Sequence, residues 1–155
     1  TQTRSMLGLL REQGTDPAAA PLQTIDDLEA LVQDVRHAGV EVRLTVTGRR
    51  RPLDPGVELT VYRVVQESLT NVLKHSGATR ALVELTYADD GVDICVRDSG
   101  RGGRLRSGAV DVAGGHGLVG LRERTRLLGG TLEYGPADGS GFRVRGHLPA
   151  PSVAP

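Results

Sequence analysis

The 155-residue sequence predicts one domain of the α/β (α+β) class, a two-layer sandwich of helices packed on a mixed β-sheet. Segments with helical spacing of apolar residues are interspersed with segments in which apolar and polar residues alternate. The composition, 38% hydrophobic and 25% charged, is that of an average soluble domain. We therefore expect one hydrophobic core between the two layers.

Charge and cysteine content exclude several classes of protein. The 19 basic and 19 acidic residues cancel, so nothing favours a nucleic-acid partner. No apolar run approaches the roughly 18 residues of a membrane helix, so we expect no membrane insertion. Cys95 is the only cysteine, which excludes an internal disulfide and any multi-cysteine metal site.

The two ends of the chain are expected to lie outside this domain. Residues 1–21 combine a short helical pattern with a Pro/Ala-rich connector, and we interpret them as the remnant of an upstream helical dimerisation domain with its linker. Residues 22–149 form the predicted domain, and residues 150–155 are predicted to be a disordered tail.

The first half of the domain begins with a helix and a strand. Thr24 is the predicted N-cap, Asp26 and Asp27 lie in the first turn, and apolar residues recur at helical spacing until Gly39 ends the helix. Residues 40–46 alternate with period two, which indicates a half-buried strand.

The longest helical pattern follows. Asp54 and Pro55 begin it, with proline at the first helical position, and it ends near residues 75–77. Residues 81–87 and 92–96 alternate on either side of an Asp-Asp-Gly turn, which predicts a hairpin.

The last third contains a loop, a helix and a second hairpin. Residues 100–115 are polar and rich in glycine, and their length indicates a functional loop. Residues 118–128 form a predicted helix, and the segments 131–134 and 141–148 form the predicted final hairpin.

A first candidate site lies on the long helix. Glu67, Asn71, Lys74 and His75 are spaced i, i+4, i+7 and i+8, which places them on one helical face. The carboxylate and amide oxygens could hold a hard cation, while Lys74 and His75 could reach anionic oxygens. The alternative is a solvated helix face without a ligand.

A second candidate site is Asp98, followed by Gly100 and Gly102. A buried carboxylate needs a donor, and the exocyclic amino group of adenine would supply one. The two glycines let the backbone turn sharply and approach a ligand closely. The alternative is an ordinary turn at the end of a strand.

A third candidate site is the glycine-rich start of the last helix, Gly115-His116-Gly117-Leu118. The free N–H groups of a helix start can bind phosphate, helped by the helix dipole. The spacing matches neither the Rossmann fingerprint nor the P-loop. The alternative is a helix start without a ligand.

Together, and in this order, the segments 62–75, 98–102 and 115–124 resemble the N, G1 and G2 boxes of the catalytic ATP-binding domain of bacterial two-component sensor histidine kinases. That superfamily also includes gyrase, the Hsp90 chaperones and the MutL proteins. The third segment is similar to the nitrate/nitrite-sensor subfamily. The resemblance implies the Bergerat ATP-binding fold, with three helices on one face of a mixed sheet and a flexible ATP lid at about residues 104–114.

The resemblance implies ATP and Mg²⁺ as cofactors. It assigns Asn71 to Mg²⁺, and Lys74 and His75 to phosphates or ribose. Glu67 would lie near the metal-bound water or act as a polarising base, which makes Glu67 and Asn71 the implied catalytic residues.

The remaining implied roles concern the base and the phosphates. Asp98 would bind the adenine amino group, and Gly100 and Gly102 would make room for the base. The nucleotide-binding residues implied at the last helix are Gly115, His116, Gly117 and Leu118, with backbone amides on the phosphates. Many relatives have Gly-Thr in a last glycine box, whereas this chain has Gly141-Phe142, so no threonine hydroxyl is expected there.

The resemblance also implies partners. A protein histidine kinase passes the γ-phosphate of ATP to a histidine on a separate dimerisation domain, and the phosphate then moves to a response regulator. None of the four histidines here is followed by an acidic residue. We therefore expect a monomeric fragment of a homodimeric, cytoplasmic phosphorelay protein, whose acceptor histidine lies on the dimerisation domain.

Three alternatives stay open from sequence. A serine kinase acting on an anti-sigma-factor antagonist shares the fold and the boxes. An ATP-driven conformational clamp of the gyrase or chaperone type would use Glu67 to activate water. A non-catalytic nucleotide-sensing module would bind ATP without transferring phosphate.

Overall fold

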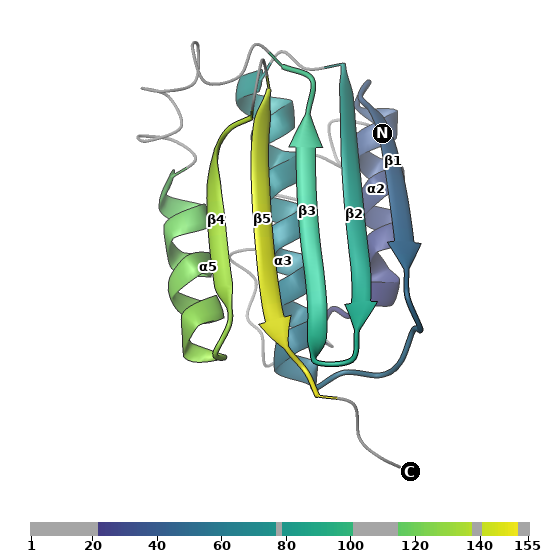
Figure 1. Cartoon of the computed structure of the whole chain (residues 1–155). Helices are drawn as coiled ribbons and strands as arrows, with labels where there is room; N and C mark the ends of the chain where they lie inside the picture. The colour runs from purple at the N-terminus through teal and green to yellow at the C-terminus, as the bar shows by residue number, and fades with distance from the viewer. Residues whose placement is uncertain (1–21, 77–78, 101–114, 138–140, 152–155) are drawn as a thin grey trace.

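The computed structural model describes residues 22–76, 79–100, 115–137 and 141–151. Five strands form one sheet in the order β1-β2-β3-β5-β4, and β1 runs parallel to β2 while the other neighbours are antiparallel (Figure 1). The strands are β1 (Glu41–Thr47), β2 (Arg80–Ala88), β3 (Gly91–Asp98), β4 (Thr131–Pro136) and β5 (Phe142–Pro149). The predicted mixed sheet is confirmed.

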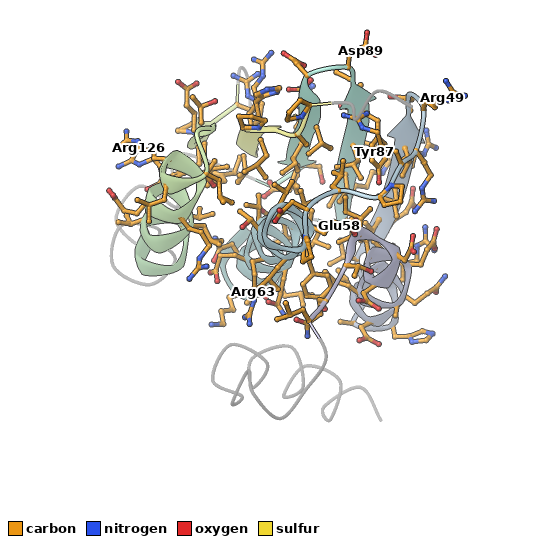
Figure 2. All side chains as sticks on the ribbon, turned by 90° about the horizontal axis from the view of Figure 1, so that it is seen from below. Arg49, Glu58, Arg63, Tyr87, Asp89 and Arg126 are labelled. Carbon is orange, nitrogen blue, oxygen red and sulfur yellow. The ribbon has the colours of Figure 1, made fainter. Side chains whose placement is uncertain are left out.

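Three α-helices lie on one face of this sheet: α2 (Leu28–His37), α3 (Pro55–Asn71) and α5 (Gly115–Leu127). Seen along the strands, sheet and helices form two layers (Figure 2). Val61, Val64 and Val65 of α3 are fully buried and pack in one core with Val83 and Val92 of the sheet. The predicted two-layer α/β fold is therefore confirmed. No helix in the described ranges is long and apolar enough to span a bilayer.

The helix starts agree with the sequence. A 3-10 turn, η2 (Ile25–Asp27), precedes α2, and the backbone N–H of Thr24 donates to Asp27 Oδ2 at 2.7 Å. Asp54 is the N-cap of α3, where its Oδ1 accepts from Gly56 N–H at 2.9 Å. A side-chain oxygen at this position satisfies an N–H group that has no partner within the helix.

The end of α3 differs from the predicted helix. The α-helical bonds stop at Asn71, and η3 (Val72–Ser76) continues as a π-helical turn. A π turn spans i→i+5 and is wider than an α turn, and such turns are frequent at functional sites. The i+7 and i+8 spacing that placed Lys74 and His75 on the face of Glu67 assumed α-helical geometry, so that spacing argument does not extend past Asn71.

Two boundaries also moved. Helix α5 begins at Gly115, three residues before the predicted start, because the first turn of a helix tolerates glycine better than the interior does. Ala150, the first residue of the predicted tail, is buried, and its N–H donates to Asp90 O at 2.9 Å. The carbonyl oxygen of Ala150 also accepts from Arg51 Nη2 at 2.6 Å. The predicted remnant at residues 1–21, the predicted lid at residues 104–114 and Gly102 lie outside the described residues.

The end of the domain seen in Figure 2 is held by satisfied polar contacts. Glu58, near the start of α3, accepts from Ile25 N–H at 3.1 Å and from Leu53 N–H at 3.0 Å. Arg50 pairs with Asp26 at 2.6 Å. These contacts join the start of α2 to the connection between β1 and α3.

Candidate nucleotide site

The three candidate sites come together at one end of the two layers. The C-terminal ends of α3 and β3 and the N-terminal end of α5 all lie at the end that is uppermost in Figure 1. They carry Asn71, Asp98 and Gly115, respectively. Segments that are far apart in sequence therefore share one edge of the fold.

Asp98 is the last residue of β3 and faces the helices, as the alternation from Ile94 through Val96 requires. Its side chain is buried, with 9% of the residue exposed. Oδ1 accepts from Gly100 N–H at 2.9 Å and from Phe142 N–H at 3.2 Å. Two backbone donors thus fix the carboxylate, and a carboxylate has further acceptor positions for a third donor.

The turn before β5 supports Asp98 through the main chain. Gly141 has φ +92° and lies so close to the Asp98 carbonyl oxygen that a Cβ atom there would collide with it. The Phe142 amide, next in the chain, then reaches the Asp98 carboxylate. The sequence did not predict the hydrogen bond from the Phe142 amide to Asp98, because only a side-chain hydroxyl was considered at position 142. The one indication in the sequence is Gly141, since glycine allows two backbone segments to approach closely.

Asn71 closes α3 and is almost fully buried, with 2% of the residue exposed. Its Nδ2 atom is buried and has no hydrogen-bond partner among the described residues. A buried polar group without a partner costs about 1–3 kcal/mol, and most buried polar groups in native structures are hydrogen-bonded. This burial rules out the alternative of a solvated helix face at Asn71.

Glu67 lies one turn before Asn71, half-buried, and meets the start of α5. A Cβ atom added at Gly117 would lie closer than 3.0 Å to the Glu67 carboxyl carbon and to both of its oxygens. The first turn of α5 has no acidic residue of its own, so the negative charge near its N-terminus comes from α3. A carboxylate at this position interacts favourably with the helix dipole.

The other predicted site residues are placed as follows. Lys74 is exposed in η3, which also contains the backbone of His75. Gly115 and His116 form the first positions of α5. Leu118 is fully buried, so its side chain belongs to the core and only its backbone could meet a ligand. Gly100 is buried beside Asp98 and donates to it.

The site therefore combines three kinds of group. The Asp98 carboxylate can accept from an amino group, and Asn71 with Glu67 offers an amide and a carboxylate suited to a hard cation. The positive end of the α5 dipole favours anions such as phosphate. A nucleoside triphosphate needs an acceptor for the amino group of its base, ligands for its metal ion and a binding position for its phosphates. This end of the fold offers all three.

Comparison with known proteins agrees with this geometry. Residues 56–152, more than half of the chain, match the family described as "Histidine kinase-, DNA gyrase B-, and HSP90-like ATPase". The chain is 29% identical over 121 residues to the sensor histidine kinase LnrJ of Bacillus subtilis, covering 77% of this chain and 29% of the relative. It is 33% identical over 155 residues to the histidine-protein kinase/phosphatase UhpB of Salmonella typhimurium, covering 94% of this chain and 28% of the relative.

Among solved structures, the fold is similar to the ATP-binding domain of PrrB from Mycobacterium tuberculosis. The TM-score is 0.58 at 25% identity, and the match covers 84% of this chain and 96% of that domain. The chain spans less than a third of the length of LnrJ and of UhpB. With the family match, the shared fold and the convergent site, this chain belongs to the histidine kinase-, DNA gyrase B- and HSP90-like ATPase family, as an ATP-binding domain like those of sensor histidine kinases.

Proposed function

We propose that this domain holds ATP and donates its γ-phosphate to a histidine on a separate dimerisation domain of the same protein, for transfer to a response regulator. The observation that carries the proposal is the buried Asn71 amide, without a partner in the described residues, next to a Glu67 carboxylate under the start of α5. Family membership and the histidine kinases among the relatives support this reading. Because the substrate is ATP, the activity belongs in the cytoplasm.

The adenine end of the site rests on Asp98. Gly100 and Phe142 hold one carboxylate oxygen in place, and the adenine amino group would donate to the remaining acceptor positions. Gly100 and Gly102 would leave room for the base. Guanine carries an oxygen where adenine carries the amino group, so the same carboxylate would reject GTP.

The metal end rests on Asn71 and Glu67. Magnesium prefers oxygen ligands and often takes only one or two from protein, with phosphate oxygens and water completing the shell. Asn71 fits, because rotation of its amide about χ2 would bring Oδ1 to the position of the unpartnered Nδ2 atom. Mg²⁺ held by Asn71, with Glu67 near its water shell, would neutralise the phosphate charge.

The phosphates would lie at the start of α5. Backbone amides of Gly115, Gly117 and Leu118 would donate to phosphate oxygens, with His116 in the same turn. Lys74 and His75 would add positive or donor groups from η3. Phosphoryl transfer depends mainly on positioning and charge stabilisation, and this arrangement supplies both.

The acceptor histidine would come from another domain. His147 of β5 lies opposite Asp93 of β3 and contacts its carboxylate at 2.7 Å, away from the Asp98 end of the strand. His37 is exposed at the C-terminal end of α2. A neutral imidazole of the dimerisation domain would attack the γ-phosphate. The glycine-rich sequence of residues 115–124 and the similarity to UhpB favour the nitrate/nitrite-sensor subfamily.

Radiolabelled ATP tests the proposal. The domain is incubated with the histidine-bearing domain of its own parent protein, with and without Mg²⁺. We expect slow labelling of that partner, stable to base and labile to acid, because free fragments lack the high effective concentration that linkage provides. Acid-stable label on a serine would support the anti-sigma alternative instead. ATP binding without any transfer to the partner would support a nucleotide-sensing module and contradict the proposal.

A further inference from the structure

The described helices contain four buried hydroxyl side chains, and three of them share one hydrogen-bond pattern. Each of the three donates to the backbone carbonyl oxygen four residues earlier, which is a common partner of serine and threonine inside a helix. The donors and acceptors are Thr60 with Gly56 at 2.8 Å, Ser68 with Val64 at 2.7 Å, and Thr125 with Leu121 at 2.7 Å.

Thr70 is the exception. The residue is only 4% exposed, and its Oγ1 atom has no hydrogen-bond partner among the described residues. The backbone carbonyl of Gln66 lies four residues earlier, yet the hydroxyl does not use it as the other three use theirs. A buried hydroxyl without a partner destabilises a fold. The Thr70 hydroxyl is therefore a candidate for contact with a ligand.

Thr70 lies beside the proposed metal-binding residues. It belongs to the last turn of α3, directly before Asn71 and three residues after Glu67. Residues three apart are neighbours on a helix surface, so Thr70 adjoins Glu67. The π turn η3 begins two residues after Thr70, and such turns are frequent at functional sites. The unpartnered hydroxyl thus falls within the end of the fold that carries the nucleotide site.

The side of α3 that carries Thr70 faces away from the sheet. Arg63 points to this side in Figure 2, and Thr70 follows it by seven residues, which is nearly two helical turns. Asn71 follows the fully buried Val64 by the same seven residues and so lies nearer the core. Asp98 belongs to the sheet itself. The order from the sheet outward is therefore Asp98, Asn71 and Thr70.

This order indicates which part of ATP meets Thr70. In the site proposed above, the base lies at Asp98 and the metal ion at Asn71. Metal ions in phosphoryl-transfer sites bridge the β- and γ-phosphates, so the terminal phosphate lies at the far side of the metal from the base. That side is the one that carries Thr70. A threonine hydroxyl can donate to a phosphate oxygen, which accepts strongly because it is charged.

We propose that the Thr70 hydroxyl donates to the terminal phosphate of ATP and thereby distinguishes ATP from ADP. The inference rests on the ATP site proposed above and adds one specificity-determining residue to it. In the empty domain the hydroxyl lacks a partner in the described chain, and the γ-phosphate supplies one. Thr70 therefore lowers the stability of the empty domain and raises its affinity for the triphosphate.

Calorimetric titrations of ATP and of ADP, both with Mg²⁺, test the proposal on the whole chain. Thr70→Val removes the hydroxyl and nearly keeps the shape, so it should weaken ATP binding about tenfold and leave ADP binding unchanged. Thr70→Ser keeps a hydroxyl and should bind both nucleotides as the parent does. The matched control is Thr60→Val in the same helix, whose hydroxyl already donates to Gly56, and it should change neither affinity.

Urea unfolding without nucleotide gives a second readout. Thr70→Val should keep or raise the urea midpoint, because it removes a buried hydroxyl that has no partner in the described chain. A lower midpoint would mean that the hydroxyl stabilises the empty domain, which would overturn the proposal. Circular dichroism confirms that each variant is folded before its affinity is compared.

Two binding results would also overturn the proposal. They are an ATP affinity of Thr70→Val equal to that of the parent, and an equal weakening of ATP and ADP binding. Both results would leave the proposed function standing, because the parent would still bind ATP. A parent that binds no ATP would instead contradict the proposed function and this inference together.

Discussion

Replacing Gly117 by alanine tests the contact between α5 and the Glu67 carboxylate. The added Cβ atom would fall closer than 3.0 Å to the carboxyl group, where ordinary contact begins at 3.4 Å. The carboxylate must therefore move by about 1 Å, which a flexible side chain can do at modest energetic cost. The change thus displaces a proposed metal-site group while the fold remains intact.

Gly120, on the same helix, provides the matched control, because a Cβ atom there meets nothing within 4 Å. Alanine is favoured over glycine in a helix interior by about 0.8–1 kcal/mol, so Gly120→Ala should raise the melting temperature by about 3 °C. Gly117→Ala gains helix propensity too, but it loses an interaction with the helix dipole of about 0.3–1 kcal/mol. Its net stability change should be near zero.

Calorimetric titration with Mg²⁺ and ATP separates the two variants. Gly120→Ala should bind as the parent does, whereas Gly117→Ala should bind about tenfold more weakly, the loss of roughly one charge-assisted contact. Equal affinity of both variants would refute the role of the Glu67 contact. A loss of several kcal/mol of stability in Gly117→Ala would also refute the reasoning, because it would mean that α5 moves rather than the carboxylate.

Three further predictions follow from single contacts. Asn71→Ala should keep or raise the free energy of unfolding, because it removes a buried amide nitrogen that has no partner in the described chain. The same variant should abolish the Mg²⁺ dependence of ATP binding. A loss of more than about 2 kcal/mol in the free energy of unfolding would contradict this prediction. Arg97→Glu replaces a like-charge pair with Arg143 by an opposite-charge pair and should raise the unfolding free energy by about 0.5 kcal/mol in urea, whereas Arg97→Lys should not. Burial, with a smaller contribution from Glu84, raises the pKa of the Cys95 thiol, so iodoacetamide should label it more slowly than free cysteine at pH 8. The unfolded thiol loses its proton first, so folding stability should fall as pH rises through about 8.5, and Cys95→Ser should remove that slope.

Local patterns predicted most of the fold. Alternation gave the strands, and the Asp54-Pro55 start and the Thr24 cap gave the helix beginnings, because each depends on neighbours in sequence. The π turn after Asn71 was not predictable in this way, since no residue type there specifies i→i+5 bonding.

The site was predictable in its residues and less so in its contacts. Asp98 stood out because a buried carboxylate at the end of a strand needs a donor. Asn71 stood out because its spacing from Glu67 places both on one helical face. The contact of Gly117 with Glu67 and the bond from the Phe142 amide to Asp98 join segments distant in sequence. Contacts of this kind depend on how α5 and β5 pack. Almost every residue type has a backbone N–H, so the sequence does not show which of these groups will act as a donor.

Calorimetric titration of ATP and GTP into the parent domain and Asp98→Asn tests the adenine site most directly. Asparagine keeps one oxygen for the Gly100 and Phe142 amides, so the variant should fold like the parent. It replaces the other oxygen by an NH₂ donor, which cannot accept from the adenine amino group. We predict that the parent prefers ATP over GTP by at least about tenfold and that Asp98→Asn loses this preference. Equal affinity of the parent for the two nucleotides would contradict the assignment of Asp98 to adenine and with it the proposed orientation of ATP in this site.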